Sequence, residues 1–301
     1  MIKSVTVINH LGESLTLELG APDLSGLLIQ QIEGLGPAKA TINTTELATY
    51  DGALYNSARL QMRNIVMTLV MMWAPTIEDA RQKTYRFFPI KKQITLVFET
   101  DNRYCECTGY VESNTPDIFS KKETTVISIL CPDPFFYSVN DGYYFKFGGY
   151  DAMFEFPFSN ESPSIPLLIM SEKNSAHSGT LLYGGDSDSG LMITIHGLGT
   201  VTGTLVLACA DTGESMEIDT SKITGGFANL DDIMISTHRG NKFIYLLRNG
   251  VYTNVINALG KNSDWLSVHQ GLNTFSYQIR DGSGADNLEI KMDYRMTYEG
   301  V

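Results

Sequence analysis

Apolar residues recur at every second position in many segments of this chain. The longest such run consists of Leu288, Ile290, Met292, Tyr294, Met296 and Tyr298, with charged or polar residues between most of them. Successive side chains of an extended strand point to opposite faces, so this spacing predicts a strand with one dry and one wet face. Shorter runs with the same spacing begin at positions 15, 94, 154, 205 and 275. The chain is therefore expected to be mostly β, with antiparallel strands.

One segment, residues 76–88, departs from this spacing and predicts a helix. Thr76 is a residue type that caps helix starts, and the acidic Glu78 and Asp79 fall in the first turn, where the helix dipole favours negative charge. Pro89 ends the segment. A helix this short is not stable alone, so we expect it to pack on a β-sheet.

A length of 301 residues suits two domains of ordinary size. The sequence CPDPFFYS, residues 131–138, contains two prolines that can end a strand and aromatic residues that can anchor the chain where it leaves a domain. We expect one β domain over residues 1–138 and a second over residues 139–301. A return of the last strand, residues 288–298, to the first domain is an open alternative.

The net charge of −12 argues against a protein that reads nucleic acid. It is divided unevenly, with −3 over residues 1–138 and −9 over residues 139–301. Affinity for nucleic acid depends on basic residues that displace counterions from phosphates, and neither half has an excess of them.

The sequence predicts neither a membrane span nor a disulfide framework. The longest apolar run, residues 65–75, is much shorter than the roughly 20 residues of a spanning helix. The first residues lack the charged start and continuous apolar stretch of a signal peptide. Of the four cysteines, Cys105 and Cys107 lie too close along one strand to bridge, and all four are expected to be reduced.

No motif in the sequence requires an enzyme or a metal site. GGDSDSG, residues 184–190, is faintly similar to the start of a hydrolase family in which Ser187 would be the nucleophile, and Asp186 and Asp188 alternate as in a calcium loop. The hydrolase block stands near an N-terminus and the calcium loop needs a later acidic ligand, so a solvated turn explains these residues better. The five histidines are scattered without the spacing of a zinc site. We therefore expect no catalytic residue, no cofactor and no metal.

Several local patterns follow one another in order along nearly the whole chain. In the first domain they are IEGLGPAKATINTTELATYDGALYNSARLQMRNI (32–65), YRFFPIKK (85–92), ITLVFETDNRYCECTGYVESNTPDIFSKKE (94–123) and CPDPFFYS (131–138). In the second they are FEFPFSN (154–160), GDSDSGLMITI (185–195), TGESMEIDT (212–220), LRNGVYTNVINAL (247–259), SDWLSVHQGLNTFSYQI (263–279) and YRMTYEGV (294–301). In this order and spacing the chain resembles the distal tail proteins of tailed bacteriophages and prophages of Gram-positive hosts. It departs from them in lacking an Asn-Pro pair in the strand at 201–209.

The resemblance implies a tail-tube-like β-barrel or sandwich with one helix, followed by a galectin-like, jelly-roll β-sandwich. It implies a structural virion protein, made in the host cytoplasm, that forms a hexameric baseplate hub ring and lets DNA pass. The implied partners are further copies of the chain, the tail tube protein, a tail-associated hub or fibre protein, and receptor-binding or adaptor proteins. Specific nucleic-acid binding, membrane insertion and cofactors are not implied.

Within such a ring, the polar segment of residues 34–63 is expected to form an extended hairpin that reaches the neighbouring subunit. A turn is predicted at Asp51-Gly52, a dipeptide that favours tight reversals. The candidate contact residues near this turn are Thr45, Glu46, Tyr50, Asp51, Gly52 and Tyr55.

Two other functions remain open from the sequence. The second sandwich could be a carbohydrate-binding module that contacts the host cell wall, and the aromatic residues at 143–150 suit either sugar binding or burial. Galectin-type sugar contacts need a group of His, Asn, Arg and Trp residues, which cannot be traced around His196 or Trp265. A hydrolase that uses Ser187 is the third alternative.

Overall fold

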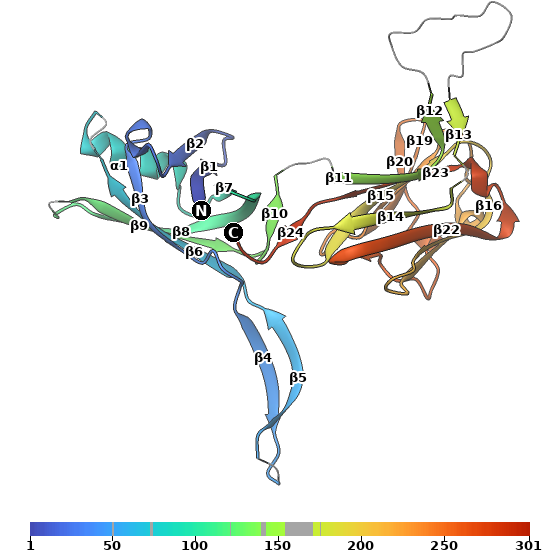
Figure 1. Ribbon diagram of the computed structural model, residues 1–301, viewed down its shortest axis with the longest axis horizontal. Helices are drawn as coiled ribbons and strands as arrows, with labels where there is room; N and C mark the ends of the chain where they lie inside the picture. The colour runs from blue at the N-terminus through green and yellow to red at the C-terminus, as the bar shows by residue number, and fades with distance from the viewer. Residues whose placement is uncertain (50, 73–74, 121, 140–142, 154–170, 175) are drawn as a thin grey trace, which may run out of the picture. The chain divides into compact units, whose positions relative to one another are not determined.

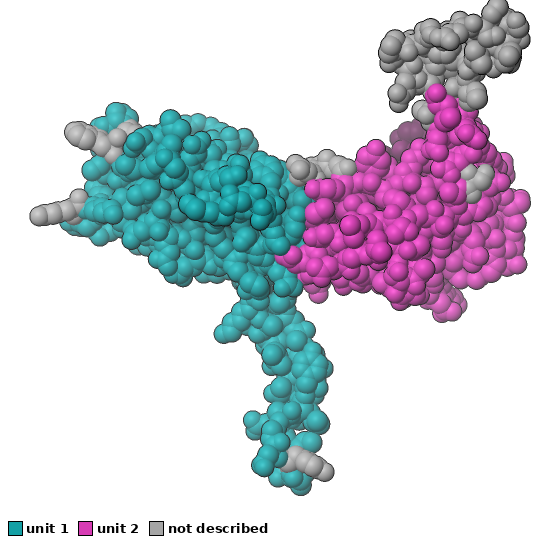
Figure 2. All heavy atoms as spheres, viewed as in Figure 1, with its two compact units in different colours: residues 1–141, 297–301 teal, residues 142–296 magenta. Residues whose placement is uncertain are grey.

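The computed structural model describes residues 1–49, 51–72, 75–120, 122–139, 143–153, 171–174 and 176–301. The chain forms two compact units, residues 1–141 with 297–301, and residues 142–296 (Figure 2). The first unit therefore extends past position 138, and the chain comes back to it for residues 297–301. The candidate residue Tyr50 and the stretch FEFPFSN lie outside the described residues.

The first unit is built on one antiparallel sheet with the strand order β2-β1-β7-β8-β9-β6-β3 (Figure 1). Its elements are β1 (Ile2–Ile8), β2 (Ser14–Glu18), the short 3-10 helix η1 (Pro22–Leu24), β3 (Leu27–Glu33), β4 (Ala40–Glu46), β5 (Ala53–Leu60), β6 (Arg63–Met71), α1 (Ile77–Phe87), β7 (Gln93–Thr100), β8 (Tyr104–Asp117), β9 (Thr124–Cys131), β10 (Phe136–Ser138) and β24 (Thr297–Tyr298). Strands β4 and β5 pair only with each other, and β24 joins the sheet through β10.

The sheet of the first unit curves around an apolar core but does not close into a barrel. Its edge strands β2 and β3 lie in contact, yet no ladder of hydrogen bonds joins them in the described part of the chain. The core side chains alternate along each strand, as in β7, where Ile94, Leu96 and Phe98 are buried. Of the expected barrel or sandwich, the barrel is therefore wrong.

The predicted helix is confirmed as α1, with the expected cap. Thr76 is in extended conformation and its side chain accepts a hydrogen bond from the Asp79 N–H at 3.1 Å. Ala80 and Thr84 are buried, and the helix lies against β6 and β8.

The second unit is a sandwich of two antiparallel sheets. One has the order β11-β23-β15-β18-β19-β20, with β21 beside β15, and the other has the order β14-β22-β16-β17. The elements are β11 (Tyr143–Gly148), β12 (Tyr150–Ala152), β13 (Ser171–Lys173), β14 (Ser178–Tyr183), β15 (Ser189–Gly197), β16 (Thr202–Cys209), β17 (Ser215–Asp219), η2 (Thr220–Lys222), β18 (Asp232–Ser236), β19 (Phe243–Arg248), β20 (Val251–Asn254), η3 (Ile256–Ala258), β21 (Ser267–Val268), β22 (Gly271–Ser283), η4 (Ala285–Asn287) and β23 (Leu288–Tyr294). Side chains from both sheets form one continuous apolar core.

The long alternating run at the end of the chain forms two strands. In β23 the register is as predicted, since Leu288, Ile290 and Met292 are fully buried and Glu289 and Lys291 are not. The expected continuous strand to residue 298 is wrong, because β23 ends at Tyr294 and the next residues to pair form β24 in the other unit.

All four cysteines are free and buried. None of the helices among the described residues is long and apolar enough to cross a bilayer.

Candidate functional site

Strands β4 and β5 form a hairpin, here called the arm, that projects from the sheet of the first unit (Figures 1 and 2). Thr45 and Glu46 end β4, Tyr55 lies in β5, and Asp51 and Gly52 lie in the turn between them. Gly52 has a positive φ of 95°, a conformation that costs glycine little. The five described candidate contact residues are therefore together at the far end of the arm, and all are exposed.

One face of the arm is polar and its side chains bond across the two strands. Asn43 donates to Ser57 at 3.0 Å, and Asn56 donates to Thr45 at 2.7 Å. The register shifts between Asn43 and Thr44, so β5 contains one additional residue, a β-bulge. These cross-strand bonds hold a ribbon that has almost no core of its own.

The opposite face of the arm is apolar and exposed. Ile42 pairs with Ala58, and Leu60 and Tyr55 follow on the same side of the ribbon. The exposed fractions are 61% for Ile42, 66% for Tyr55 and 41% for Leu60. Contiguous apolar side chains exposed on a projecting element are typical of surfaces that contact another molecule.

The root of the arm is fixed by a buried arginine. Arg63, which begins β6, is 3% exposed. Its four side-chain hydrogen bonds in the described part of the chain all go to backbone carbonyls. Its Nη1 donates to Gly34 and Gly36, where the chain enters the arm, and its Nε donates to Pro134 at 2.7 Å, where the chain leaves β9. Its guanidinium carbon also lies 4.3 Å from the centre of the Phe136 ring. Burial lowers the pKa of Arg63, but an arginine keeps its proton in proteins.

Residues 297–301 pack beside this root. In β24, Tyr298 pairs with Phe136 of β10. Arg103 donates to the Gly300 carbonyl at 2.6 Å and lies over the Tyr298 ring at 4.5 Å. The segment is thus held by a strand pair and by an arginine on the β7–β8 turn.

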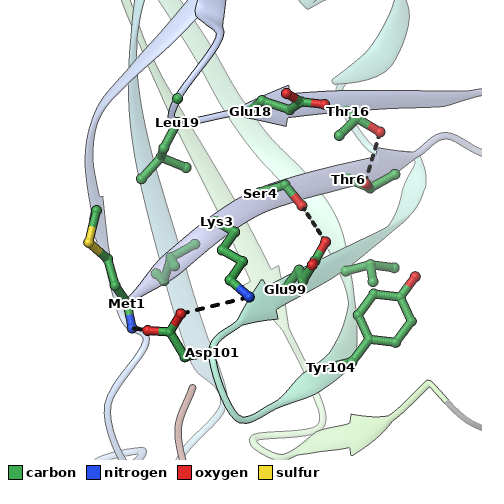
Figure 3. A pocket seen from close by; sticks show the side chains of 13 residues that line it. Met1, Lys3, Ser4, Thr6, Thr16, Glu18, Leu19, Glu99, Asp101 and Tyr104 are labelled. Atoms are coloured by element: carbon green, nitrogen blue, oxygen red, sulfur yellow. Dashed lines mark hydrogen bonds and ion pairs between the residues drawn. The ribbon is translucent and has the colours of Figure 1, made fainter.

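A second feature of the first unit is a shallow cavity of about 620 Å³ on the outer face of β1, β2 and β7 (Figure 3). In Figure 3, Thr6 faces Thr16 and Ser4 faces Glu99, with hydrogen bonds of 3.0 and 3.2 Å. Lys3 lies 3.7 Å from Asp101. The basic groups that line this cavity, Lys3 and the amino group of Met1, are thus both paired with Asp101.

The charge on this outer face is acidic. Glu18 and Glu99 lie opposite Ser4 on its two sides, and Glu106 follows on β8. The outward positions of β2, β7 and β8 here hold serine, threonine, glutamate, glutamine, tyrosine and the cavity-lining Val97, with no lysine or arginine. Such a surface repels polyanions.

The GGDSDSG stretch contributes to a Ser–His–Asp arrangement that sequence reasoning missed. His269 Nε2 lies 3.1 Å from Ser267 Oγ, and its Nδ1 lies 2.9 Å from Asp188. However, a Glu214 oxygen lies 3.3 Å from the same Oγ, and this carboxylate also accepts the Ser267 N–H at 3.2 Å. A carboxylate there opposes the negative charge that serine attack develops and occupies an N–H that could stabilise it. The arrangement is a surface hydrogen-bond network, and Ser187 is not the serine in it.

Among the residues that the structure describes, no group of His, Cys, Asp and Glu is arranged to hold a metal ion. His177 and His196 each pair singly with an aspartate, Asp286 and Asp232 respectively.

Sequence reasoning identified the turn of the arm but missed its apolar face and Arg63. The alternation of Ala40 and Ile42 with polar residues was the available signal for the face. For Arg63 the signal was a basic residue directly before an apolar strand, which by itself says nothing of its partners.

The fold is similar to that of a solved phage protein over its full length. The structure of the SPP1 Dit protein (gp 19.1), described as a paradigm of the hub adsorption apparatus in phages that infect Gram-positive bacteria, matches with a TM-score of 0.62 and 12% identity, over 98% of this chain and 99% of that one. At this identity the similarity shows that the fold is shared. Two structures of the phage P2 baseplate in its activated conformation, with Ca and with Sr, match over 99% or more of both chains at a TM-score of 0.44 and 10% identity, too low to add to that argument.

No protein-family model matches the chain, and no curated protein matches it by sequence.

Proposed function

We propose that this protein is a structural component of a phage tail tip, in which six copies form a closed ring that joins the tail tube to the receptor-binding apparatus. The observation that carries the proposal is the match to the SPP1 Dit protein over 98% of this chain. A single β-sandwich is shared by proteins of many functions, whereas this match extends over both units. In this proposal the ring also binds a hub or fibre protein and lets DNA pass.

The arm supports a ring of identical subunits. Its apolar face, with Ile42, Tyr55 and Leu60, is exposed within one chain and needs a cover from another. A head-to-tail contact between copies generates either a closed ring or an open filament, and a ring covers every arm with no unused end. The candidate contact residues at the arm tip, from Thr45 to Tyr55, would then lie against the neighbouring copy.

Deletion of residues 45–55 tests the ring. We expect the wild-type protein to have the native mass of a hexamer and to appear as rings in electron micrographs, and the deletion variant to be a folded monomer. Permanent contacts between subunits usually bury more than about 2,000 Å². In the proposed ring the arm supplies much of this buried area, so we expect the deletion variant to be monomeric at micromolar concentration. A wild-type monomer would contradict the ring itself, whereas a deletion variant that still forms rings would contradict only the role of the arm.

Carbohydrate binding by the second unit is the second candidate function. A cavity of about 560 Å³ beside β20 has the amides of Asn249, Asn254 and Asn257 at its rim. Its floor contains Ile223 and Val255, which are 3% and 5% exposed. Lys222 and Arg248 also line the cavity, and each is paired with an aspartate, Asp219 and Asp231 respectively. Amide donors and acceptors beside apolar side chains suit a sugar, and the volume is within the usual range of ligand pockets.

Screening the full-length protein on an array of neutral glycans tests this second function. We expect Asn257→Ala to weaken any binding and Asn262→Ala, which changes an exposed asparagine of the same unit, to retain it. Absence of binding in the wild-type protein, or equal binding by both variants, would contradict a sugar site here.

A further inference from the structure

Residues 299–301 contact the root of the arm directly. The Val301 N–H donates to the Leu35 carbonyl at 3.1 Å, and Arg63 Nη2 donates to the Glu299 carbonyl at 2.7 Å. Gly300 lies so close to Leu35 that a Cβ at its position would be 3.0 Å from the Leu35 carbonyl oxygen. The returning segment and the entrance to the arm thus form one packed layer.

Arg63 links this segment to two others through different nitrogens. Nη1 bonds to the arm root at Gly34 and Gly36, Nε bonds to Pro134, and Nη2 bonds to Glu299. The guanidinium is a rigid planar fork, so its nitrogens move together, and a shift of one carbonyl displaces the bonds to the others.

The burial of Arg63 makes these bonds interdependent. A charged group removed from water is costly unless its donors are satisfied, and Arg63 is 3% exposed. If the Glu299 carbonyl leaves, Nη2 must find water, and the side chain has to shift outward from the Gly34 and Gly36 carbonyls to reach it. Glycine is required at position 34, where φ is +84° and a Cβ would meet the Asn64 backbone oxygen at 2.1 Å, so the root has little freedom to follow.

We propose that Arg63 makes the position of the arm root depend on the docking of residues 297–301, so that the arm is held for assembly only while this segment is docked. The dependence is reciprocal, since a coupling free energy acts equally in both directions. Residues 142–296 lie between the two parts of the first unit, so docking of residues 297–301 also closes a long loop, and a disordered second unit adds the entropy of that closure to its cost.

Hydrogen exchange on the unassembled full-length chain tests this coupling, and it does so whether or not a ring forms. Tyr298→Ala loosens the segment by removing the ring that lies against Arg103, and it leaves every group that hydrogen-bonds to Arg63 in place. We expect exchange of peptides covering Gln61, whose N–H donates to the Lys39 carbonyl at the arm root at 2.8 Å, to rise by roughly tenfold or more, while the core strands β9 and β15 keep their protection. The matched control, Tyr110→Ala, removes a tyrosine that is 46% exposed on β8 of the same unit and should leave these peptides unchanged.

A second pair of variants perturbs the layer by shape. Gly300→Val introduces atoms against Leu35 and Gly36, whereas Gly20→Val adds them where nothing lies within 4 Å. We expect faster exchange of the Gln61 amide in the first variant only.

The role of Arg63 itself is tested by a double-mutant cycle. Arg63→Lys keeps the charge but loses the fork, and we expect Tyr298→Ala to add little to exchange at the root in that background. Unchanged root exchange in both Tyr298→Ala and Gly300→Val would overturn the coupling. If the exchange rate at the root in the double variant rises by the product of the two single-variant increases, the two residues act independently. That result would overturn the assignment to Arg63.

Discussion

The arm of the first unit and strand β23 of the second share one sequence pattern and have opposite environments. In β23, Leu288, Ile290 and Met292 have no exposed area, because the facing sheet of the same unit covers them. In the arm, Ile42 and Tyr55 are 61% and 66% exposed. Alternation shows that a strand has an apolar face, but it does not say which chain covers that face.

The difference has a consequence for how each region responds to substitution. A face covered within the chain contributes to folding, whereas a face covered by another chain contributes to association. The same kind of change, an apolar residue replaced by a charged one, should therefore have different readouts in the two regions.

The largest effect is expected from Met292→Asp in β23. An unpaired charge on this fully buried position should cost several kcal/mol, against a total stability of about 5–15 kcal/mol. Denaturant unfolding should show the second unit largely unfolded. The neighbouring Lys291→Asp lies on the wet face beside Asp293 and should cost less than about 1 kcal/mol. Equal losses in the two variants would mean that the two faces of β23 do not differ as described.

Ile42→Asp makes the matching change on the arm. Because Ile42 is already exposed, we expect the free energy of unfolding to change by less than about 0.5 kcal/mol. In the proposed ring the charge would enter the surface that the neighbouring copy covers, so native mass should nevertheless shift from ring to monomer. Asn43→Asp, one residue along on the polar face, is the control and should still assemble. A destabilised Ile42→Asp monomer would show that the chain itself covers this face.

A smaller effect concerns Tyr277 in the core of the second unit. Tyr277 is 4% exposed and donates to the Ala285 carbonyl at 3.1 Å, and burial raises its pKa to about 12. In the unfolded chain a tyrosine titrates near about 10, so the folded state favours the neutral form. This stabilisation is complete below about pH 10 and is lost as the pH rises through about 12.

The check is urea unfolding of Tyr277→Phe across that range. At neutral pH the variant should be less stable by about 1 kcal/mol, because it lacks one hydrogen bond. The difference in free energy of unfolding between the variant and the wild type should shrink as the pH rises from about 10 to about 12. Over this range only the wild-type protein loses the stabilisation that comes from neutral, buried Tyr277. Curves that remain parallel to the highest pH would contradict a raised pKa.

The smallest effect is an expected null result on DNA. The outer face with Glu18, Glu99 and Glu106 has its nearby basic groups paired, and the chain carries −12. We expect the assembled protein to cause no retardation of double-stranded DNA even at low salt, where screening is weakest. Micromolar binding that weakens steeply with added salt would point to a basic track on another surface.

Local signals were read from the sequence correctly because their causes are local. The helix predicted at 76–88 is Ile77–Phe87, and the cap at Thr76 depends on residues three positions apart. The register of β23 follows from alternation alone, since a shift by one residue would expose every apolar side chain.

Features that depend on distant partners could not be read in this way. The alternation at the end of the chain continues past Tyr294, but the pairing changes from β15 and β11 to β10, so one expected strand became two. Arg63 bonds to carbonyls at positions 34, 36, 134 and 299, and backbone carbonyls leave no trace in the sequence. The Ser267, His269 and Asp188 cluster likewise joins residues from the ends of two strands, β21 and β15, that are far apart in the sequence.

The bulge in the arm affects the solubility of the free chain. A two-stranded ribbon has two unpaired edges, and a long regular edge invites another strand to add to it. The register shift between Asn43 and Thr44 interrupts the regular spacing of donors and acceptors and twists the ribbon at its middle. The β5 edge of a free arm therefore cannot pair in one continuous register with another arm, which hinders aggregation of newly made chains along that edge while the apolar face stays exposed.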